Sequence, residues 1–378
     1  MPLDVAIVGA GPVGATLAAL LAPLGLEVAL FEARTGAASD RRTLALSHGS
    51  REQLEQAGAW PAGTTAITSI HISQMGGPGR TLLQAAEQGI PALGYTVSYA
   101  ALEAALAARL AGTGVPIHYG EACNAIELSP DEAKLRFASG REAHARLLVL
   151  ADGGANAARI PGIAFHEKDY DQSAVVGTVR SDRPHGQRAY ERFTPRGPMA
   201  LLPVDTHFAL VWTASPGEAQ RLLQLDAGEF VAELQTRFGD RAGRFTSIEG
   251  RGAFPLRLRA VNTPVALRTA IIGNAAQALH PIAGQGLNLG LRDAAALAHA
   301  IASAPAQAGS TAMLDEYRDA RRRDAGRGIA FTDLLVSTFA DGRRLPTWGR
   351  GLALTALDLF PPARRWLAER MIHGAPSP

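Results

Sequence analysis

Residues 4–14 read Asp-Val-Ala-Ile-Val-Gly-Ala-Gly-Pro-Val-Gly, a short β-branched run that leads directly into a glycine-rich turn. Such a run is typical of a buried parallel strand. An Ala- and Leu-rich helix is predicted to follow over residues 15–24. In this arrangement Gly9 permits the tight turn, Gly11 lets the backbone approach a pyrophosphate, and Gly14 allows the helix to pack closely on the strand. The segment therefore predicts a dinucleotide-binding βαβ unit.

A second strand is predicted over residues 26–31, and it ends in an acid. Glu32 lies 23 positions after Gly9, where a carboxylate can accept hydrogen bonds from both ribose hydroxyls. Glycine-rich turns also occur for purely structural reasons, but here strand, turn, helix, strand and acid follow one another in order. The acid disfavours a ribose 2′-phosphate, which argues against NADP at this site. NAD and FAD both fit these residues.

A second glycine-rich segment lies in the C-terminal half. A strand predicted over residues 265–272 leads into residues 273–293, where glycines are concentrated just before a helix that continues to about Ser303. A helix that opens with so few side chains presents free backbone N–H groups to an electron-rich partner. In a flavin protein that partner would be the N1–C2=O edge of the isoalloxazine ring, whereas an NAD dehydrogenase needs no second site of this kind.

Three segments together resemble the FAD motifs of class A aromatic hydroxylases, the group related to p-hydroxybenzoate hydroxylase. They are the Gly9 loop with Glu32, the step Ala151-Asp152-Gly153 after an apolar strand, and residues 273–293. From about residue 3 to about residue 370 the chain is moreover similar to the ubiquinone-biosynthesis hydroxylase family. The stretches that carry this second resemblance are residues 40–47, 93–97, 169–174, 191–203 and 254–256.

The resemblance implies which residues hold the cofactor. FAD contacts are expected at Gly9, Gly11, Pro12, Gly14, Glu32, Ala33, Arg42, Asp152, Gly153, Gly273, Asn274, Pro281, Gly284, Gln285, Gly286, Leu287 and Asn288. His280 and Pro281 are expected over the flavin face as the catalytic positions, although the backbone of His280 could matter more than its ring. Arg42 could equally be a solvent-facing charge. Where the family commonly has Asp, this chain has Asn274, so weaker FAD binding is expected.

The reaction implied by the resemblance is hydroxylation of an aromatic ring, that of a polyprenylated phenol in ubiquinone biosynthesis. NADH or NADPH would supply the electrons, and O2 would react through a C4a-hydroperoxyflavin. The cofactor carries this chemistry, while the protein supplies orientation and a dry cavity. Two alternatives stay open: a non-oxygenating FAD oxidoreductase of the prenyl-lipid reductase type, and a non-catalytic flavin-binding scaffold of a biosynthetic complex.

The predicted fold is α/β, with a Rossmann-like FAD-binding domain, an inserted antiparallel-sheet substrate domain and C-terminal helices. The FAD-binding domain is expected over residues 1–70, 94–165 and 262–310, the substrate domain over 71–93 and 166–261, and the helical region over 311–378. Short alternating segments predict the antiparallel sheet. Tyr190, Phe193 and Leu202 are expected to line a long apolar substrate cavity there, although each could face the other side of its strand.

Composition excludes several other classes of protein. The 378 residues carry 37 basic and 35 acidic side chains, so no chain-wide field favours nucleic acid. Cys123 is the single cysteine, which excludes an internal disulfide, and no metal-binding motif is present. No secretory signal or membrane span is predicted, and a cytoplasmic location is expected.

Arginines stand out near the C-terminus. Residues 348–371 mix apolar side chains with arginines and are broken by Pro361-Pro362. Such an amphipathic segment could rest on the inner face of the membrane, contact a ubiquinone-biosynthesis complex, or pack on the flavin domain. The run Arg321-Arg322-Arg323 is predicted to be a solvated helix face.

Overall fold

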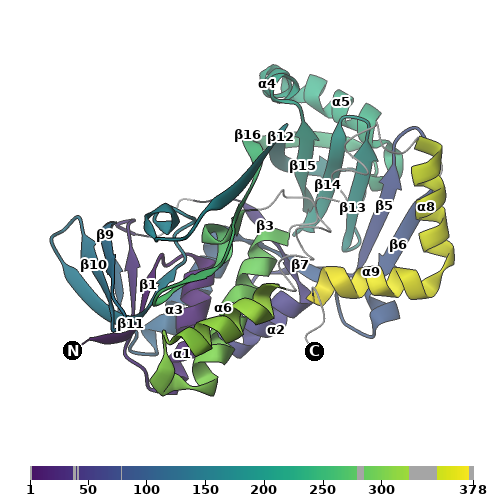
Figure 1. The fold of residues 1–378 in the computed structure, drawn as a ribbon. Coiled ribbons are helices and arrows are strands. Elements are labelled where there is room, and N and C mark those ends of the chain that lie inside the picture. Colours follow the sequence, from purple (N-terminus) through teal and green to yellow (C-terminus); the bar gives the residue numbers. More distant parts are fainter. Residues whose placement is uncertain are drawn as a thin grey trace.

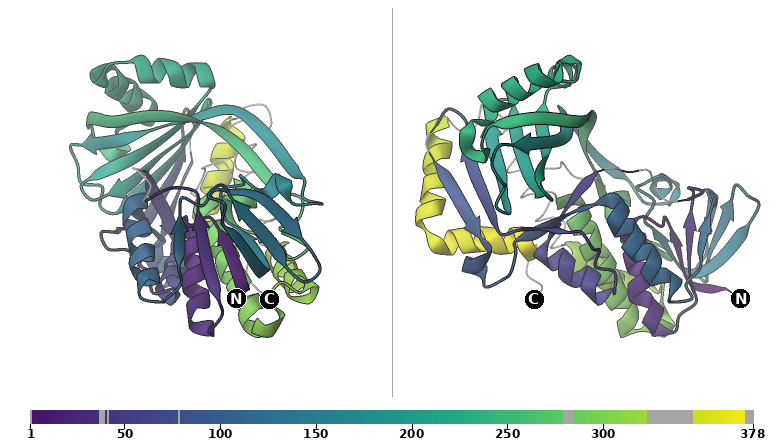
Figure 2. Two further views of the ribbon diagram at one scale, coloured as in Figure 1. Left: turned by 90° about the vertical axis from the view of Figure 1, so that its left-hand side faces the viewer. Right: turned by 180° about the vertical axis from the view of Figure 1, so that it is seen from behind.

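The computed structural model describes residues 2–36, 40, 42–77, 79–278, 285–322 and 347–373. They form two lobes, each built on its own large sheet (Figure 1). Two long strands, β12 (Phe165–Ser181) and β16 (Phe245–Val261), run from one lobe into the other, as the further views in Figure 2 show. The predicted α/β fold class is confirmed.

The first sheet is parallel at its centre, as the glycine motif predicts. Strand β1 (Leu3–Val8) lies between β2 (Val28–Glu32) and β11 (Glu142–Leu150), and both pairings are parallel. All four residues from Val5 to Val8 are buried, because helices and strands cover both faces of this sheet. The other strands of the sheet are β8 (Ile117–Tyr119), β9 (Cys123–Leu128), β10 (Ala133–Phe137), β17 (Val265–Ala266) and β18 (Thr269–Ile271).

Helices α1 (Pro12–Leu21) and α6 (Gln285–Ser303) pack against each other and cover one face of this sheet. Their contact is close because Gly290 on α6 has no side chain: a Cβ there would lie 2.8 Å from Cγ2 of Val13. Helix α3 (Tyr99–Ala111) packs on the other side of α1. Helix α2 (His48–Gln56) and the small sheet of β3 (Thr43–Ser47), β4 (Thr65–Ile67) and β7 (Gly94–Ser98) join the two lobes.

The second sheet is antiparallel except where β5 (Ser69–Gln74) runs parallel to β13 (Arg188–Thr194). Its order is β19-β16-β12-β15-β14-β13-β5-β6. The bounds of the remaining strands are β6 (Arg80–Gln84), β14 (Gly197–Val204), β15 (His207–Ala214) and β19 (Gln277–Ala278). Successive side chains point to opposite faces, so one face packs on helices and the other faces the interior between the lobes.

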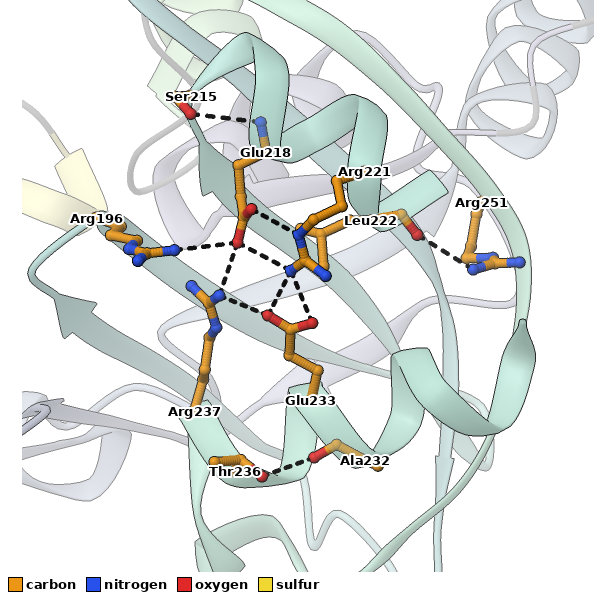
Figure 3. A network of polar contacts seen from close by, with 10 residues as sticks. All are labelled: Arg196, Ser215, Glu218, Arg221, Leu222, Ala232, Glu233, Thr236, Arg237 and Arg251. Atoms are coloured by element: carbon orange, nitrogen blue, oxygen red, sulfur yellow. Dashed lines mark hydrogen bonds and ion pairs between the residues drawn. The ribbon is translucent and has the colours of Figure 1, made fainter. Parts of the chain in front are cut away.

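Helices α4 (Pro216–Gln224) and α5 (Ala227–Phe238) cover the outer face of the second sheet (Figure 1). An ion-pair network locks the two helices together (Figure 3). Glu218 on α4 accepts hydrogen bonds from Arg221 and Arg237, and both arginines also bond Glu233 on α5. The pKa of Glu218 falls to about 2 because these guanidinium groups stabilise its anion.

The C-terminal region is helical where it is described. Residues 311–322 form a helix, followed after a gap by α8 (Thr347–Leu359) and α9 (Pro361–His373). Helix α8 lies along β6, and α9 runs back toward α2 (Figure 1). Within the described ranges, no helix combines the length and the apolar character needed to cross a membrane.

One arginine of the predicted solvated run behaves differently. Arg321 is only 5 % exposed and pairs with Asp293, whereas Arg322 is exposed. The prediction is therefore wrong for Arg321, because the helix of residues 311–322 turns this side chain toward α6. Arg323 lies outside the described residues.

Candidate functional site: a cavity between the two sheets

A cavity of about 1600 Å³ lies between the lobes and takes its walls from both sheets. It is larger than the roughly 300–1,000 Å³ that is usual for a site holding one small molecule. One end is lined by the predicted nucleotide motifs, and the other by apolar residues of the second sheet and the C-terminal helices. The cavity therefore has room for a dinucleotide cofactor together with a substrate.

The three positions of the first motif require glycine for different physical reasons. Gly9 has φ +105°, and a Cβ there would lie 2.5 Å from the carbonyl oxygen of Ala151. A Cβ on Gly14 would lie 2.1 Å from the carbonyl oxygen of Gly9. These two glycines are thus required by the fold. Gly11 is different, because its φ is an ordinary −67° and a Cβ would meet nothing closer than Tyr99 Oη at 3.9 Å.

Gly11 thus keeps open a space that no protein atom fills. It lines the cavity and is the N-cap of α1, where the first backbone N–H groups of the helix have no partner within the helix. The positive end of the helix dipole faces the same space. An anionic group such as a pyrophosphate fits this position, and Pro12 beside it also lines the cavity.

Glu32 lies at the carboxyl end of β2, on the wall of the cavity. Its Oε2 accepts a hydrogen bond from the Ala10 backbone N–H at 2.8 Å, and its Oε1 accepts from Nε of Arg34 at 3.0 Å. Burial raises the pKa of Glu32, but the hydrogen bonds from Arg34 and Ala10 lower it by more, so that the pKa lies below its ordinary value. The carboxylate therefore stays ionised on the wall of the cavity, where Oε1 also accepts from the Arg34 backbone N–H at 3.0 Å and Oε2 from Arg34 Nη2 at 3.3 Å.

Arg34 and Arg42 flank this part of the cavity. Arg34 also donates to Glu103 at 2.9 Å, and Arg42 pairs with Asp40 at 2.6 Å while its guanidinium lies over the ring of Tyr99. Arg42 lines the cavity and is at the same time exposed, and its contact with FAD stays a prediction. Arg34 was not predicted; its position two residues after the strand-terminal acid is the signal that could have found it.

The Asp152-Gly153 step forms a tight turn beside the cavity. The Asp152 carboxylate accepts hydrogen bonds from the backbone N–H groups of Gly154 at 2.9 Å and Asn156 at 3.0 Å. Gly153 has φ +73°, a conformation that favours glycine. Asp152, Gly153 and Ala33 all line the cavity, so the first and second motifs meet there.

The Gly273 segment is anchored from behind by Asp293. Oδ2 of this carboxylate accepts from the backbone N–H of Gly273 at 2.9 Å and from Nε2 of Gln277 at 2.6 Å. Gly273 has φ +62° and packs on Val13. Neither Gly273 nor Gly14 lines the cavity; both shape it from outside. Asn274 does line it and is exposed, so its amide is free to face a cofactor.

The N-terminal end of α6 reaches the cavity through Gly286, Leu287 and Asn288. The side chain of Asn288 is already used, because its Oδ1 accepts from the Ser47 backbone N–H at 2.8 Å and from Ser50 Oγ at 2.7 Å. It thereby holds α6 against β3 and α2. Only its backbone is left for the predicted flavin contact.

Some predicted site residues cannot be placed. His280, Pro281 and Gly284 lie outside the described residues, as does the side chain of Gln285, whose backbone begins α6. Their proposed roles over the flavin face and at its pyrimidine edge stay predictions.

The three predicted substrate residues divide between the faces of the second sheet. Phe193 and Leu202 line the cavity. Tyr190 touches the cavity wall, but its ring packs against Phe208 and Phe238 on the helix-covered face, and its hydroxyl donates to the Arg241 carbonyl at 3.1 Å. Tyr190 therefore shapes the sheet rather than offering its ring to a ligand.

The residues present fit FAD. The Gly11 space at the α1 N-terminus suits a pyrophosphate, the ionised Glu32 suits a ribose, and the α6 N-terminus suits an electron-rich ring edge. No cluster of three or more His, Cys, Asp or Glu side chains that could hold a metal occurs in the described part of the chain. Fold and cavity thus define a flavoprotein whose one large sheet is of the Rossmann type and whose other is antiparallel, with the cavity between them.

The chain belongs to the family of the FAD binding domain, whose model matches residues 2–332. It is 35 % identical to ubiquinone hydroxylase UbiL of Rhodospirillum rubrum, covering 96 % of this chain and 87 % of that protein. It is 31 % identical to 3-demethoxyubiquinol 3-hydroxylase of Escherichia coli, covering 94 % and 95 %. The predicted FAD cofactor and the predicted resemblance to ubiquinone hydroxylases are confirmed.

Solved structures show the same fold. The crystal structure of p-nitrophenol 4-monooxygenase PnpA from Pseudomonas putida DLL-E4 superimposes with a TM-score of 0.78 at 18 % identity, covering 100 % of this chain and 99 % of that one. PqsL of Pseudomonas aeruginosa, in complex with 2-aminobenzoylacetate, gives a TM-score of 0.75 at 23 % identity, covering 91 % and 98 %. The protein is thus an FAD-dependent enzyme with the fold of flavin monooxygenases.

Proposed function

We propose that this enzyme hydroxylates the aromatic ring of a polyprenylated phenol in ubiquinone biosynthesis, with O2 and with NADH or NADPH as electron donor. The observation that carries the proposal is the two-part cavity, polar at the nucleotide motifs and apolar beyond them. Relatives named as ubiquinone hydroxylases at up to 35 % identity support the same substrate class. Bound FAD supplies the redox chemistry that activates oxygen.

The residues of the chain would bind, orient and shield. Gly11 and the α1 N-terminus would hold the pyrophosphate, and Glu32 the ribose. Backbone N–H groups at the start of α6, near Gly286, would stabilise the negative charge that develops at the ring edge on reduction. The Asp293 bond to Gly273 would keep this region in place.

The apolar end of the cavity would take the polyprenyl tail. It is lined by Ile70 and Leu83 of the second sheet and by Leu354, Leu367 and Ile372 of the C-terminal helices. A chain of isoprene units buried there gains roughly 25 cal/mol for each Å² removed from water. The same apolar walls exclude water from the place where oxygen is activated.

We further propose that the corner between α8 and α9 contacts the membrane in which such a substrate dissolves. Leu359 is 77 % exposed, Phe360 59 % and Trp366 54 %, and Trp366 also lines the cavity. Phe360→Asp should reduce the fraction of protein that sediments with anionic lipid vesicles. The control Leu267→Asp changes an exposed apolar position of the first lobe and should leave that fraction unchanged. Equal sedimentation of both variants and the wild type would refute membrane contact at this corner.

The test of the function is substrate-dependent turnover. Purified FAD-loaded protein, given a phenol carrying one isoprenyl group and NADH or NADPH in air, should form a product one oxygen atom heavier by mass spectrometry. A reductase of prenyl lipids would instead add hydrogen and would not need oxygen. A scaffold protein would oxidise no NADH or NADPH in response to the phenol.

A further inference from the structure

One acidic side chain of the second sheet faces the cavity in apolar surroundings. Glu191 lies on β13, and the residues on the same face of that strand, Ala189 and Phe193, line the cavity with it. Its direct neighbours in register are Ile72 on β5 and Ala200 on β14. Neither neighbouring strand presents a titratable or charged side chain to this face: β5 contributes Ile70 and Ile72, and β14 contributes Pro198, Ala200 and Leu202.

The one charged side chain next to Glu191 in sequence, that of Arg192, points to the other face of the sheet. Arg192 donates to the carbonyl of Arg237 on α5 at 3.0 Å and is buried under that helix. Burial alone raises the pKa of Glu191 to about 8, because no hydrogen-bond donor or cation of the described chain stabilises its anion. An uncompensated carboxyl in an apolar wall is costly for folding, and groups of this kind cluster at sites where a ligand uses them.

We propose that Glu191 binds the phenolic hydroxyl of the substrate and acts as the base that accepts its proton. The inference rests on the proposed hydroxylation of a phenol. Its position favours this role, since the carboxyl sits in the apolar substrate part of the cavity and not among the nucleotide motifs. A ring whose tail lies toward Leu354 and Leu367 and whose reacting carbon faces the cofactor can present its hydroxyl to this strand.

The proton transfer is balanced within the pair. The O–H bond of the phenol breaks, its electron pair stays on the phenolic oxygen, and an O–H bond forms on the Glu191 carboxylate. The phenolate so formed is a better nucleophile at the ring carbons ortho and para to it, which is where an electrophilic oxygen adds. The ring carbon that gains the oxygen loses its hydrogen as a proton, which restores aromaticity, and this proton leaves with the second oxygen atom of O2 as water, the electrons coming from NADH or NADPH. The carboxyl then returns its own proton to the phenolic oxygen.

The match of acidities supports the transfer. A phenol has a pKa of about 10, so an ordinary glutamate near 4.3 would be a weak base toward it. Burial brings Glu191 to within about two units of the phenol, close to the working pH, where general-base catalysis is most efficient. The ionised form is the active one, so hydroxylation should speed up as pH rises and level off above about pH 8.

The experiment uses the FAD-loaded enzyme, a phenol carrying one isoprenyl group, and the methyl ether of that phenol. Wild type should show the rising pH profile for hydroxylated product. Glu191→Gln should be slower by about a hundredfold, with a flat profile between pH 6 and 9. Glu191→Asp should recover part of the rate and of the pH dependence. The control Glu249→Gln changes an exposed acid of β16 and should match wild type.

Binding gives a second readout that does not need turnover. Followed by the change in the flavin absorption spectrum, wild type should bind the phenol at least about tenfold more tightly than its methyl ether. Glu191→Leu, which suits the apolar wall, should reduce that preference to about one. Retained preference in Glu191→Leu, or an unchanged rate and pH profile in Glu191→Gln, would overturn the role of Glu191. Failure of the wild type to hydroxylate any phenol would instead overturn the proposed function, while the binding comparison would still decide whether Glu191 holds the hydroxyl.

Discussion

Asp293 and Arg321 form a buried ion pair, with Arg321 Nε 2.6 Å from Asp293 Oδ1 and both residues at most 5 % exposed. The same carboxylate bonds Gly273 and Gln277 through its other oxygen. One side chain of α6 thus joins the helix of residues 311–322 to the segment that leads into the cavity. The site is held in place from a part of the chain that does not touch it.

The first prediction concerns this pair. Arg321→Met should lower the free energy of unfolding by about 3–5 kcal/mol, because it leaves the Asp293 carboxylate buried without its cation. FAD retention should fall with it, since Gly273 loses a fixed anchor. Arg322→Met, the adjacent exposed position, is the matched control and should stay within about 0.5 kcal/mol. Urea unfolding of both variants measures the difference, and equal stabilities would contradict the anchoring role.

The second prediction separates the glycines of the first motif. Gly11→Val should fold normally, because φ is ordinary and the nearest atom to a Cβ is 3.9 Å away, yet it should lose bound FAD. Gly14→Ala should instead destabilise the protein itself, since its Cβ would lie 2.1 Å from the Gly9 carbonyl oxygen. Flavin absorbance per protein and thermal unfolding without FAD distinguish the two. A Gly11→Val protein that retains FAD would show that the open space is not the pyrophosphate site.

The third prediction is about Glu32. Glu32→Ala should weaken FAD binding by roughly 1–3 kcal/mol, as expected for the loss of charge-assisted hydrogen bonds, and Glu32→Gln by less. Because the pKa of Glu32 is lowered from 4.5, the carboxylate is fully ionised above that pH and protonates only as pH falls through its lower folded value. FAD affinity of the wild type should therefore not change through Glu32 between pH 6 and 9. A Glu32→Ala variant with unchanged affinity, measured by fluorescence titration of FAD, would remove Glu32 from the site.

The sequence predicts the local fold at the nucleotide motifs because its signals are local. The spacing of Gly9, Gly11 and Gly14 with Glu32 specifies a strand, a turn and a helix whose geometry needs no distant contact. The ion pair of Arg321 could not be predicted, because its signal is not local. Its partner Asp293 lies 28 residues earlier, and only the packing of two helices brings the two side chains together. Most of the neighbours of Arg321 in sequence are charged, and such a run favours a solvated face.

Predicting the substrate half of the site depends on knowing which face of the sheet each side chain of a strand points to. Alternation places Phe193 and Leu202 toward the cavity and the ring of Tyr190 toward α5, but sequence alone does not tell which face of a two-sided sheet is which. In the sequence Glu191 lies between Tyr190 and Arg192, and nothing in that local pattern singles it out. Its significance comes only from the apolar side chains of β5 and β14, which lie beside it through pairing of distant segments.

The fourth prediction is a pH-dependent stability effect of Glu191. Its pKa is raised from 4.5 to about 8 in the folded protein, so the folded state binds the proton more tightly than the unfolded state. Stability contributed by the protonated form is complete below pH 4.5 and is lost as pH rises toward 8. Glu191→Gln should therefore raise the melting temperature relative to wild type by an amount that grows from pH 5 to pH 8. A difference that is constant over this range would contradict the raised pKa.

The fifth prediction concerns the start of α6. Gly286→Pro removes one backbone N–H from the first turn, where proline is tolerated by the helix. The variant should either lose FAD or consume NADH or NADPH while releasing hydrogen peroxide instead of hydroxylated product. Gly286→Ala keeps the N–H and places its methyl group in open space, so it should remain coupled. Peroxide and product are measured together, and full coupling in Gly286→Pro would exclude this N–H from the chemistry.

The incorporation of isotopically labelled dioxygen tests the hydroxylase assignment most directly. Wild-type enzyme loaded with FAD is given the prenylated phenol, NADH or NADPH, and ¹⁸O₂ in unlabelled water. Mass spectrometry should find one ¹⁸O atom in each molecule of hydroxylated product and no product when oxygen is removed. Product that takes its oxygen from water, or that forms equally well without oxygen, would contradict the assignment and favour a non-oxygenating flavin enzyme.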